Sequence, residues 1–260
     1  MKILVVLLSF FSVFSVAEPI DFSRFKMVDL SHSFDKETVY WPTASSGFEL
    51  HRDAYGMTKG GYFYSANSFS TPEHGGTHLD APIHFSEQGW RLDDIPLDRL
   101  LGTAIVINVS AKVSRAPDYR LTVADIEAFE ASHGLIEPDT MVLMRTDYSQ
   151  YWPDAARYLG SDKPGDASDL HFPSYGEAAA RLLIEQRKVK AIGVDTASID
   201  YGPSKDFVVH RIAAAHNVLG FENLSHLEEL SPVGVTLIAL PMKIGGGSGG
   251  PLRVVALVPK

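Results

Sequence analysis

Short apolar runs rich in β-branched residues recur along the chain. Such runs predict strands, because branched side chains pack well on a pleated surface. Seven strands are predicted in this way: Met27–Leu30, Tyr62–Phe69, Thr103–Val109, Met141–Arg145, Ala191–Val194, Val235–Leu240 and Val254–Val258.

Three longer segments fit helices. Thr122–Ser132 starts with Thr122 and Asp125, and Tyr175–Arg187 follows a polar stretch. Ser204–Val218 is the third, with Ser204 placed to cap it after Pro203. Strands interleaved with few helices predict one α/β domain around a strand-rich core. Between them, residues 151–172 are rich in Asp, Pro, Gly and Ser, and we expect a long surface loop or lid there.

The first residues, "MKILVVLLSFFSVFSVAEP", differ from the rest of the chain. Lys2 precedes an apolar run that is too short to span a membrane, and Ser15-Val16-Ala17 forms a small-x-small cleavage pattern. We interpret residues 1–17 as a secretory signal peptide and residues 18–260 as the mature domain. An uncleaved anchor or a buried first strand is the alternative. The signal predicts a secreted or periplasmic protein that is free of the membrane after cleavage.

Charge and cysteine content narrow the possible chemistry. The net charge of −9, with no basic stripe, argues against a nucleic-acid partner. The chain has no cysteine. Any metal must therefore be held by His, Asp and Glu, a ligand set that suits zinc, manganese or a similar divalent ion.

The glycine-rich stretch Gly245–Gly250, "GGGSGG", formally contains the G-x-G-x-x-G spacing of dinucleotide-binding loops. That motif requires a helix directly after it, whereas Pro251 and a strand-like run follow here. We expect instead a glycine-rich loop that borders a pocket.

The stretch "EHGGTHLDAPIHF" concentrates His74, His78, Asp80 and His84 within a few residues. Two glycines and a proline exclude a helix. In an extended chain residues of equal parity share one side, so a single strand, bulged at the glycines, would present all four groups to one cavity. The odd positions Leu79, Ala81, Ile83 and Phe85 would then pack behind it.

A polar face held together by hydrogen bonds, without a metal, is the alternative for this cluster. Four such groups on one face would, however, leave buried imidazole and carboxylate atoms unsatisfied. The pattern therefore indicates a metal site.

The motif H-x-G-T-H-x-D-x-P-x-H at residues 74–84 resembles the signature of the metal-dependent cyclase family, which includes bacterial kynurenine formamidase and isatin hydrolase. The resemblance continues in "VDLSHSF", "YWP", "GVDTASIDYGPSKDFVVH" and "ENL". It implies a swivelling β/β/α fold, a metal-dependent hydrolase over residues 18–260, and a homo-oligomer.

The resemblance also implies roles for particular residues. His74, His78 and Asp80 would be metal ligands, with Asp80 bridging two ions in two-metal members, so one or two ions per chain are expected. His210 and Glu222, twelve residues apart, would complete the second site. The alternative for His210 is an ordinary histidine on a helix surface, and the alternative for Glu222 is a solvent-exposed acid. His216 is a rival ligand about 120° around the same predicted helix.

His84 resembles the catalytic histidine of the family. It would take a proton from a water molecule and return one to the leaving nitrogen. A bound divalent ion would activate this water by lowering its pKa to about 7. Such chemistry hydrolyses an amide without a Ser or Cys nucleophile, and the chain has neither a cysteine nor a G-x-S-x-G motif.

The expected substrate is a small aryl amide. The resemblance implies that Trp41, in the "WP" element, lines the substrate site. Ser198 and Asp200 would orient substrate or neighbouring groups, although a tight turn through Gly202-Pro203 also explains both. "WPTA" and "MRTDYSQYW" depart from the formamidase pattern "WPG" and "RTG", whereas "SIDYGPSKDF" is similar to isatin hydrolase. We therefore expect the reaction to be the opening of a cyclic amide such as isatin. Deformylation of N-formylkynurenine and a secreted, non-catalytic metal-binding protein are the alternatives.

Overall fold

A closed sheet forms the centre of the molecule. The structure, a computed structural model, describes residues 19–260. Seven strands pair side by side in a ring that β4 closes by pairing with both β10 and β12. In ring order they are β12 (Gly249–Pro259), β11 (Val235–Pro241), β5 (Leu101–Asn108), β7 (Met141–Arg145), β9 (Ala191–Val194), β10 (Leu219–Glu222) and β4 (His78–Asp80). β1 (Phe25–Asp29) adds to β12 outside the ring.

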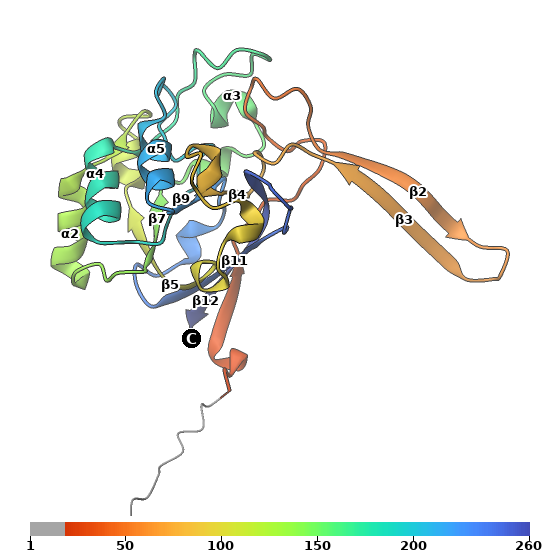
Figure 1. The fold of residues 1–260 in the computed structure, drawn as a ribbon, viewed down its shortest axis with the longest axis horizontal. Helices are drawn as coiled ribbons and strands as arrows, with labels where there is room; N and C mark the ends of the chain where they lie inside the picture. Colours follow the sequence, from red (N-terminus) through yellow and green to blue (C-terminus); the bar gives the residue numbers. More distant parts are fainter. Residues whose placement is uncertain (1–18) are drawn as a thin grey trace, which may run out of the picture.

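Helices cover one side of this sheet (Figure 1). They are α2 (Val123–His133), α4 (Glu177–Arg181), which continues as a π-helical turn over Leu182–Gln186, and α5 (Val208–Ala215). Smaller elements are α1 (Ser110–Val113), α3 (Ala155–Tyr158) and the two-residue strands β6 (Arg120–Leu121) and β8 (Ser174–Tyr175). Single 3₁₀ turns occur at Phe22–Arg24, Pro82–His84, Leu92–Asp94, Leu97–Arg99, Tyr148–Tyr151 and Leu227–Glu229.

The core has two parts because the central strands are buried on both faces. Along β5, Ile105 and Ile107 belong to the cluster shared with the helices, whereas Ala104 and Val106 belong to the cluster enclosed by the ring. This double burial explains why these strands read as continuous apolar runs in the sequence. The expected single α/β domain of the swivelling β/β/α type, with a strand-rich core, is confirmed.

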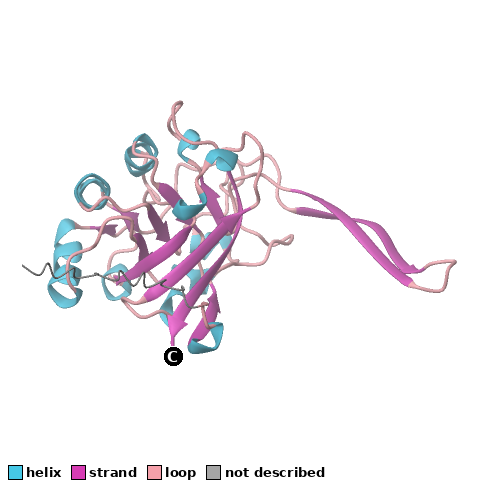
Figure 2. Cartoon of the chain, turned by 60° about the horizontal axis from the view of Figure 1, so that its bottom comes forward, coloured by secondary structure: helices cyan, strands magenta, loops and turns pink. Residues whose placement is uncertain are grey.

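A long hairpin leaves this body and projects far from it (Figures 1 and 2). It consists of β2 (Glu49–Met57) and β3 (Phe63–Ser70), which pair only with each other. We call this hairpin, residues 49–70, the arm. No membrane-spanning helix is found among residues 19–260, since none of their helices is long and apolar enough.

The strand predictions at Met141–Arg145 and Ala191–Val194 match the structure residue for residue, and the other five are shifted or shortened. β2 and β10 were not predicted. β2 is largely exposed and has no continuous apolar run, and β10 is a run of only four residues directly after the predicted helix Ser204–Val218. Residues 151–172 form a loop around the short α3, as expected.

Two helix predictions need correction. The segment at Tyr175 begins as strand β8, and the helix starts only at Glu177. α5 starts at Val208, and Ser204 does not cap it: its hydroxyl accepts from Phe207 N, while Asp200 accepts from the helical N–H groups. The predicted signal peptide, residues 1–17, lies outside the described residues, so it stays a prediction, and so does the domain boundary at residue 18.

Tyr175 provides a test of the core. Its buried hydroxyl lies 2.9 Å from the carbonyl of Val142 in β7 and 2.8 Å from that of Gly193 in β9. We expect Tyr175→Phe to lower the free energy of unfolding by about 1–3 kcal/mol, because the buried carbonyls lose a donor. Urea denaturation measures this. Tyr62→Phe, at an exposed tyrosine, is the control and should change stability by less than about 0.5 kcal/mol. Equal stability of both variants would contradict the assignment.

Candidate metal centre

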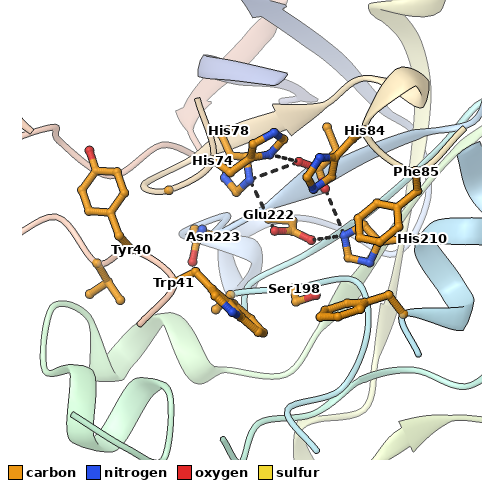
Figure 3. Close-up of a pocket in the computed structure, with 15 residues that line it drawn as sticks. Tyr40, Trp41, His74, His78, His84, Phe85, Ser198, His210, Glu222 and Asn223 are labelled. Carbon is orange, nitrogen blue, oxygen red and sulfur yellow. Dashed lines mark hydrogen bonds and ion pairs between the residues drawn. The ribbon is translucent and has the colours of Figure 1, made fainter. Parts of the chain in front are cut away.

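A cavity of about 280 Å³ opens where the ring closes at β4 (Figure 3). It brings together side chains from distant parts of the sequence. Its lining residues are Val39, Tyr40, Trp41, His74, Gly75, His78, Asp80, His84, Phe85, Ala197, Ser198, Phe207, His210, Glu222 and Asn223. Eight of the nine predicted catalytic, metal-binding and substrate-binding residues therefore line this single cavity, and the exception is Asp200.

The pairing of β4 explains how two of the acids reach the cavity. His78 lies directly opposite Glu222 of β10, so their side chains share one face of the sheet. Asp80 lies opposite Gly220 on one side and Gly249 on the other. A Cβ atom added at Gly220 would lie 3.3 Å from Cβ of Asp80. Gly220 thus leaves the space beside the Asp80 side chain, and Gly249 leaves the space beside the His74 ring.

The prediction that one strand carries all four motif residues is wrong, because the strand holds only two of them. β4 contains only His78, Leu79 and Asp80; His74 lies in the preceding loop, and His84 ends a 3₁₀ turn that starts at Pro82. The chain turns at Pro82 and still returns His84 to the cavity, with its ring stacked on that of His74 at a centroid distance of 3.8 Å. Phe85, expected to pack behind the strand, lines the cavity instead.

Asp80 lies at the centre of the cluster, within reach of three imidazoles. Its Oδ1 is 2.7 Å from His74 Nδ1 and 3.2 Å from His78 Nε2, and its Oδ2 is 3.1 Å from His210 Nε2. Glu222 lies beside it, 3.4 Å from His78 Nε2 and 3.2 Å from His210 Nε2. Except for His74, all of these groups are buried.

Each of the three imidazoles has its other nitrogen bound to an acceptor of the protein. His78 Nδ1–H donates to the carbonyl of Gly76 at 3.0 Å, and His210 Nδ1–H donates to the Asp200 carboxylate at 2.7 Å. His74 Nε2 lies 2.9 Å from the Ser248 hydroxyl.

The Ser248 hydroxyl donates its only proton to Glu73, at 2.6 Å, and must therefore accept from His74. When these three rings are neutral, the nitrogen that faces the carboxylates is then the one with the lone pair. Protein acceptors orient metal-binding histidines in the same way.

The described residues fit a divalent cation at this place. His78 Nε2 is buried and has no hydrogen-bond partner, although two carboxylates lie near it. Burial disfavours the charged form of His78, but the Asp80 carboxylate, 3.2 Å from Nε2, and the charge of Glu222 outweigh it and raise its pKa to about 9. Burial likewise opposes ionisation of Asp80, yet the surrounding histidines hold its pKa well below the usual value. Two buried carboxylates thus draw positive charge into the cluster, and a metal ion supplies it directly.

The side chains that could hold a metal form two groups that share Asp80. His74, His78 and Asp80 are one group, and Asp80, His210 and Glu222 are the other; in each, one ligand atom per residue lies within 4.8 Å of the rest. This arrangement accommodates one ion or two, with Asp80 as the bridge in the second case. Nitrogen and oxygen ligands suit both zinc and manganese.

The remaining predicted residues fall into three places. Trp41 and Ser198 line the cavity, as His84 does. Burial lowers the pKa of His84 to about 4, so its imidazole is neutral at pH 7. Asp200 does not line the cavity, so a contact with substrate is not supported; its contacts fit the other expected role, because it lies behind His210 and holds that ring. His216 is not a rival ligand, because its ring bonds to the carbonyl of Ile212 away from the cluster.

Several residues of the site were not found from the sequence. Phe207, Asn223 and Tyr40 line the cavity, and Glu73 and Ser248 orient His74. Ser248 lies in the glycine-rich loop, and a Cβ atom at its neighbour Gly249 would lie 2.6 Å from the His74 ring. The sequence analysis predicted that this glycine-rich loop borders a pocket, but it did not identify Ser248 as a residue of the site.

We expect His78→Ala to lower the metal content of the purified protein, because it removes a ligand that no other described group replaces. Elemental analysis after dialysis against zinc or manganese measures the loss. His216→Ala, which removes a histidine outside the cavity, is the matched control and should leave the metal content unchanged. A normal metal content in His78→Ala would contradict its role as a ligand.

Comparisons with known proteins agree with this geometry. The sequence model of the family Cyclase, described as "Putative cyclase", matches residues 28–201. The chain is 34% identical to an isatin hydrolase of Roseibium aggregatum over 77% of each protein. It is 30% identical to a kynurenine formamidase of Salinibacter ruber, over 88% of this chain and 96% of that one.

Solved structures give the same result. Isatin hydrolase A from Ralstonia solanacearum superposes with a TM-score of 0.82 at 33% identity, covering 91% of this chain and 93% of that one. An isatin hydrolase bound to the product analogue thioisatinate gives a TM-score of 0.81 at 29% identity, covering 92% and 94%. The chain therefore belongs to the cyclase family.

Proposed function

We propose that this protein is a metal-dependent amidohydrolase that opens a neutral cyclic aryl amide of the isatin type. The observation that carries the proposal is the cavity itself. Three oriented imidazoles and two buried carboxylates lie on one side of it, and aromatic side chains lie on the others. Figure 3 shows Trp41 below the cluster and Phe85 beside His210. A flat aromatic substrate fits between such walls with its amide next to the metal ligands.

The charges of the lining separate the two candidate substrates. None of the fifteen residues that line the cavity is Lys or Arg. N-formylkynurenine carries an amino-acid group whose carboxylate would enter this cavity without a cationic side chain to pair with, which is costly in a poorly hydrated site. Isatin carries no charge. The lining therefore favours isatin, as does the higher identity to the isatin hydrolase of Roseibium aggregatum.

A divalent metal held by the five ligands would supply an activated water and polarise the amide carbonyl. In the reaction the water oxygen bonds to the amide carbon, the carbon–nitrogen bond breaks, and the product carries a free aryl amine and a carboxylate. The neutral His84 imidazole takes a proton from the attacking water and returns one to the leaving nitrogen. Asp200 holds His210 in place, and the Glu73–Ser248 pair holds His74.

We also propose that the mature protein is exported to the periplasm or the medium. This part of the proposal depends on the amino-terminal sequence alone: Lys2, the short apolar run and the cleavage pattern at Ser15-Val16-Ala17. Exported hydrolysis would act on small aryl amides before they enter the cell.

The first experiment is a parallel assay of the mature chain, stripped of metal and reloaded with zinc or manganese, against isatin and N-formylkynurenine. We expect metal-restored hydrolysis of isatin, followed by loss of its absorbance, and a kcat/KM for isatin that exceeds that for N-formylkynurenine. Faster hydrolysis of N-formylkynurenine would assign the protein to the formamidases. Tight metal binding without turnover of either would favour the non-catalytic alternative or another amide.

His84→Ala tests the proton-transfer role. We expect unchanged metal content and a kcat lowered by roughly 10²-fold or more, because general acid–base groups contribute about that much. Steady-state kinetics together with elemental analysis measure both quantities. Full activity in this variant would remove His84 from the mechanism, and a loss of metal would make it a ligand instead.

A further inference from the structure

Asn223 joins three parts of the chain beside the metal centre. It directly follows Glu222 at the end of β10, lines the cavity (Figure 3) and is only 3% exposed. Its backbone N–H donates to the carbonyl of Thr196 at 2.9 Å, and its carbonyl accepts from the Thr77 hydroxyl at 2.6 Å. Its φ of 54° is left-handed, a conformation that asparagine adopts more readily than most residues. The backbone of Asn223 therefore ties the end of β10 to the residue before β4 and to the segment after β9.

The side chain of Asn223 continues this bonding in two directions. Its Nδ2–H donates to the carbonyl of Gly76 at 2.7 Å, and its Oδ1 accepts from the Tyr158 hydroxyl at 2.9 Å. The Gly76 carbonyl can only accept, so the amide nitrogen must face it, and this determines the orientation of the amide. The Tyr158 hydroxyl lies farther, 3.3 Å, from the carbonyl of Asp195. Tyr158, which is fully buried in α3, thus orients the amide of Asn223.

The carbonyl of Gly76 is also the acceptor that orients His78. It accepts from His78 Nδ1–H at 3.0 Å as well as from Asn223, so both of its lone pairs are used. Gly75 and Gly76 have φ values of 149° and 58°, and glycine is the residue with the most backbone freedom. A carbonyl in such a segment needs a fixed donor outside the segment to keep its direction. Asn223 supplies this donor from the end of a paired strand.

We propose that Asn223 and Tyr158 are positioning residues of the metal centre. The hydrogen bonds run from Tyr158 through Asn223 to the Gly76 carbonyl. That carbonyl holds the proton of His78 on Nδ1 and leaves the Nε2 lone pair facing the two carboxylates. Both polar atoms of the Asn223 side chain are already bonded to the protein, so their effect on the metal passes through His78. The inference rests on the metal centre and is independent of which amide the protein hydrolyses.

Two buried tyrosines separate a role in the site from a role in stability alone. Tyr158 and Tyr175 are 0% and 1% exposed, and each hydroxyl lies near two buried oxygen atoms. The Tyr175 hydroxyl contacts only carbonyls of central strands, whereas the Tyr158 hydroxyl donates to Asn223. Tyr158→Phe and Tyr175→Phe should therefore both lower the free energy of unfolding. Only Tyr158→Phe should also weaken metal binding.

Asn223→Gly removes the amide and keeps a residue that accepts positive φ. Its matched control is Asn217→Gly, because Asn217 also has a positive φ, 53°, and its Oδ1 accepts from Trp90 N outside the cavity.

The metal-free proteins are titrated with zinc in competition with a chelating dye, and circular dichroism checks that each variant folds. We expect Asn223→Gly to weaken zinc binding by about 10- to 100-fold, as loss of an outer partner of a ligand does. Tyr158→Phe should weaken it by about three- to tenfold, since one hydrogen bond behind Asn223 is lost. Asn217→Gly and Tyr175→Phe should bind zinc as the wild type does.

Cobalt gives a readout of ligand geometry that a general loss of stability does not change. Co²⁺ accepts the same nitrogen and oxygen ligands, and its visible absorption depends on their number and arrangement. We expect the spectrum of cobalt-loaded Asn223→Gly to differ from that of the wild type, because the His78 ring is no longer held in one orientation. The two control variants should give the wild-type spectrum. Turnover is not the readout, because Asn223 also lines the cavity.

Three outcomes would overturn the proposal. The first is wild-type zinc affinity and cobalt absorption in both Asn223→Gly and Tyr158→Phe, which would mean that His78 is oriented without them. The second is equal weakening of zinc binding by Tyr158→Phe and Tyr175→Phe, which would reduce the effect to stability. The third is a wild-type protein that binds neither metal, which would remove the metal centre itself. These measurements give the same answer whether or not isatin is hydrolysed.

Discussion

Two carboxylates buried beside three imidazoles are the constraint on which the site depends. Asp80 and Glu222 cannot remain charged in the interior without compensating positive charge. The three rings cannot supply it as neutral donors, because their outer nitrogens already donate to Gly76, Asp200 and Ser248. Protons or a metal ion must therefore enter the cluster. A metal satisfies the lone pairs and the carboxylates together, and its binding releases the protons that the empty cluster would hold.

The closed sheet makes this crowding possible. Its shortest strand, β4, pairs on both sides, and two of its three residues, His78 and Asp80, belong to the groups that could hold a metal. Strand pairing fixes His78 opposite Glu222, while Gly220 in β10 leaves room for Asp80 and Gly249 in β12 leaves room for His74. The helix α5 adds His210, whose backbone and ring are both held by Asp200. Because each ligand lies on a paired strand or is fixed by hydrogen bonds, the site needs little rearrangement to receive an ion.

The arm and the site are linked by an aromatic path. Phe69 at the base of β3 stacks on Phe48, and Phe48 packs against Phe34. The Phe34 ring in turn fills the space beside Gly76, between the ligands His74 and His78. Gly76 has a φ of 58°, so a larger residue there would meet both strain and this ring. The loop that carries His74 is therefore packed between the cavity and the base of the arm.

The sequence by itself determined the chemistry of the first ligand cluster. The concentration of His74, His78, Asp80 and His84, with no cysteine in the chain, was enough to indicate a metal site, and the long motif indicated the family. Periodicity also located the central strands, because β7 and β9 are buried on both faces and read as unbroken apolar runs. Residues that are close along the chain carry their geometry with them, and such local patterns are what sequence reasoning detects.

Only the tertiary structure decided what joins this cluster and how each member is used. Ser248 is distant from His74 in the sequence, and no local pattern relates the Glu73–Ser248 pair to the ring that it holds. The position of Asp200 behind His210 depends on where α5 begins, and the sequence did not fix that point. A contact between Asp200 and substrate was therefore one of its two expected roles. Likewise, Asn223 joins Gly76 and Tyr158, which lie far apart in the sequence. Pairing between distant segments sets all of these positions, and it is determined by the packing of the whole chain.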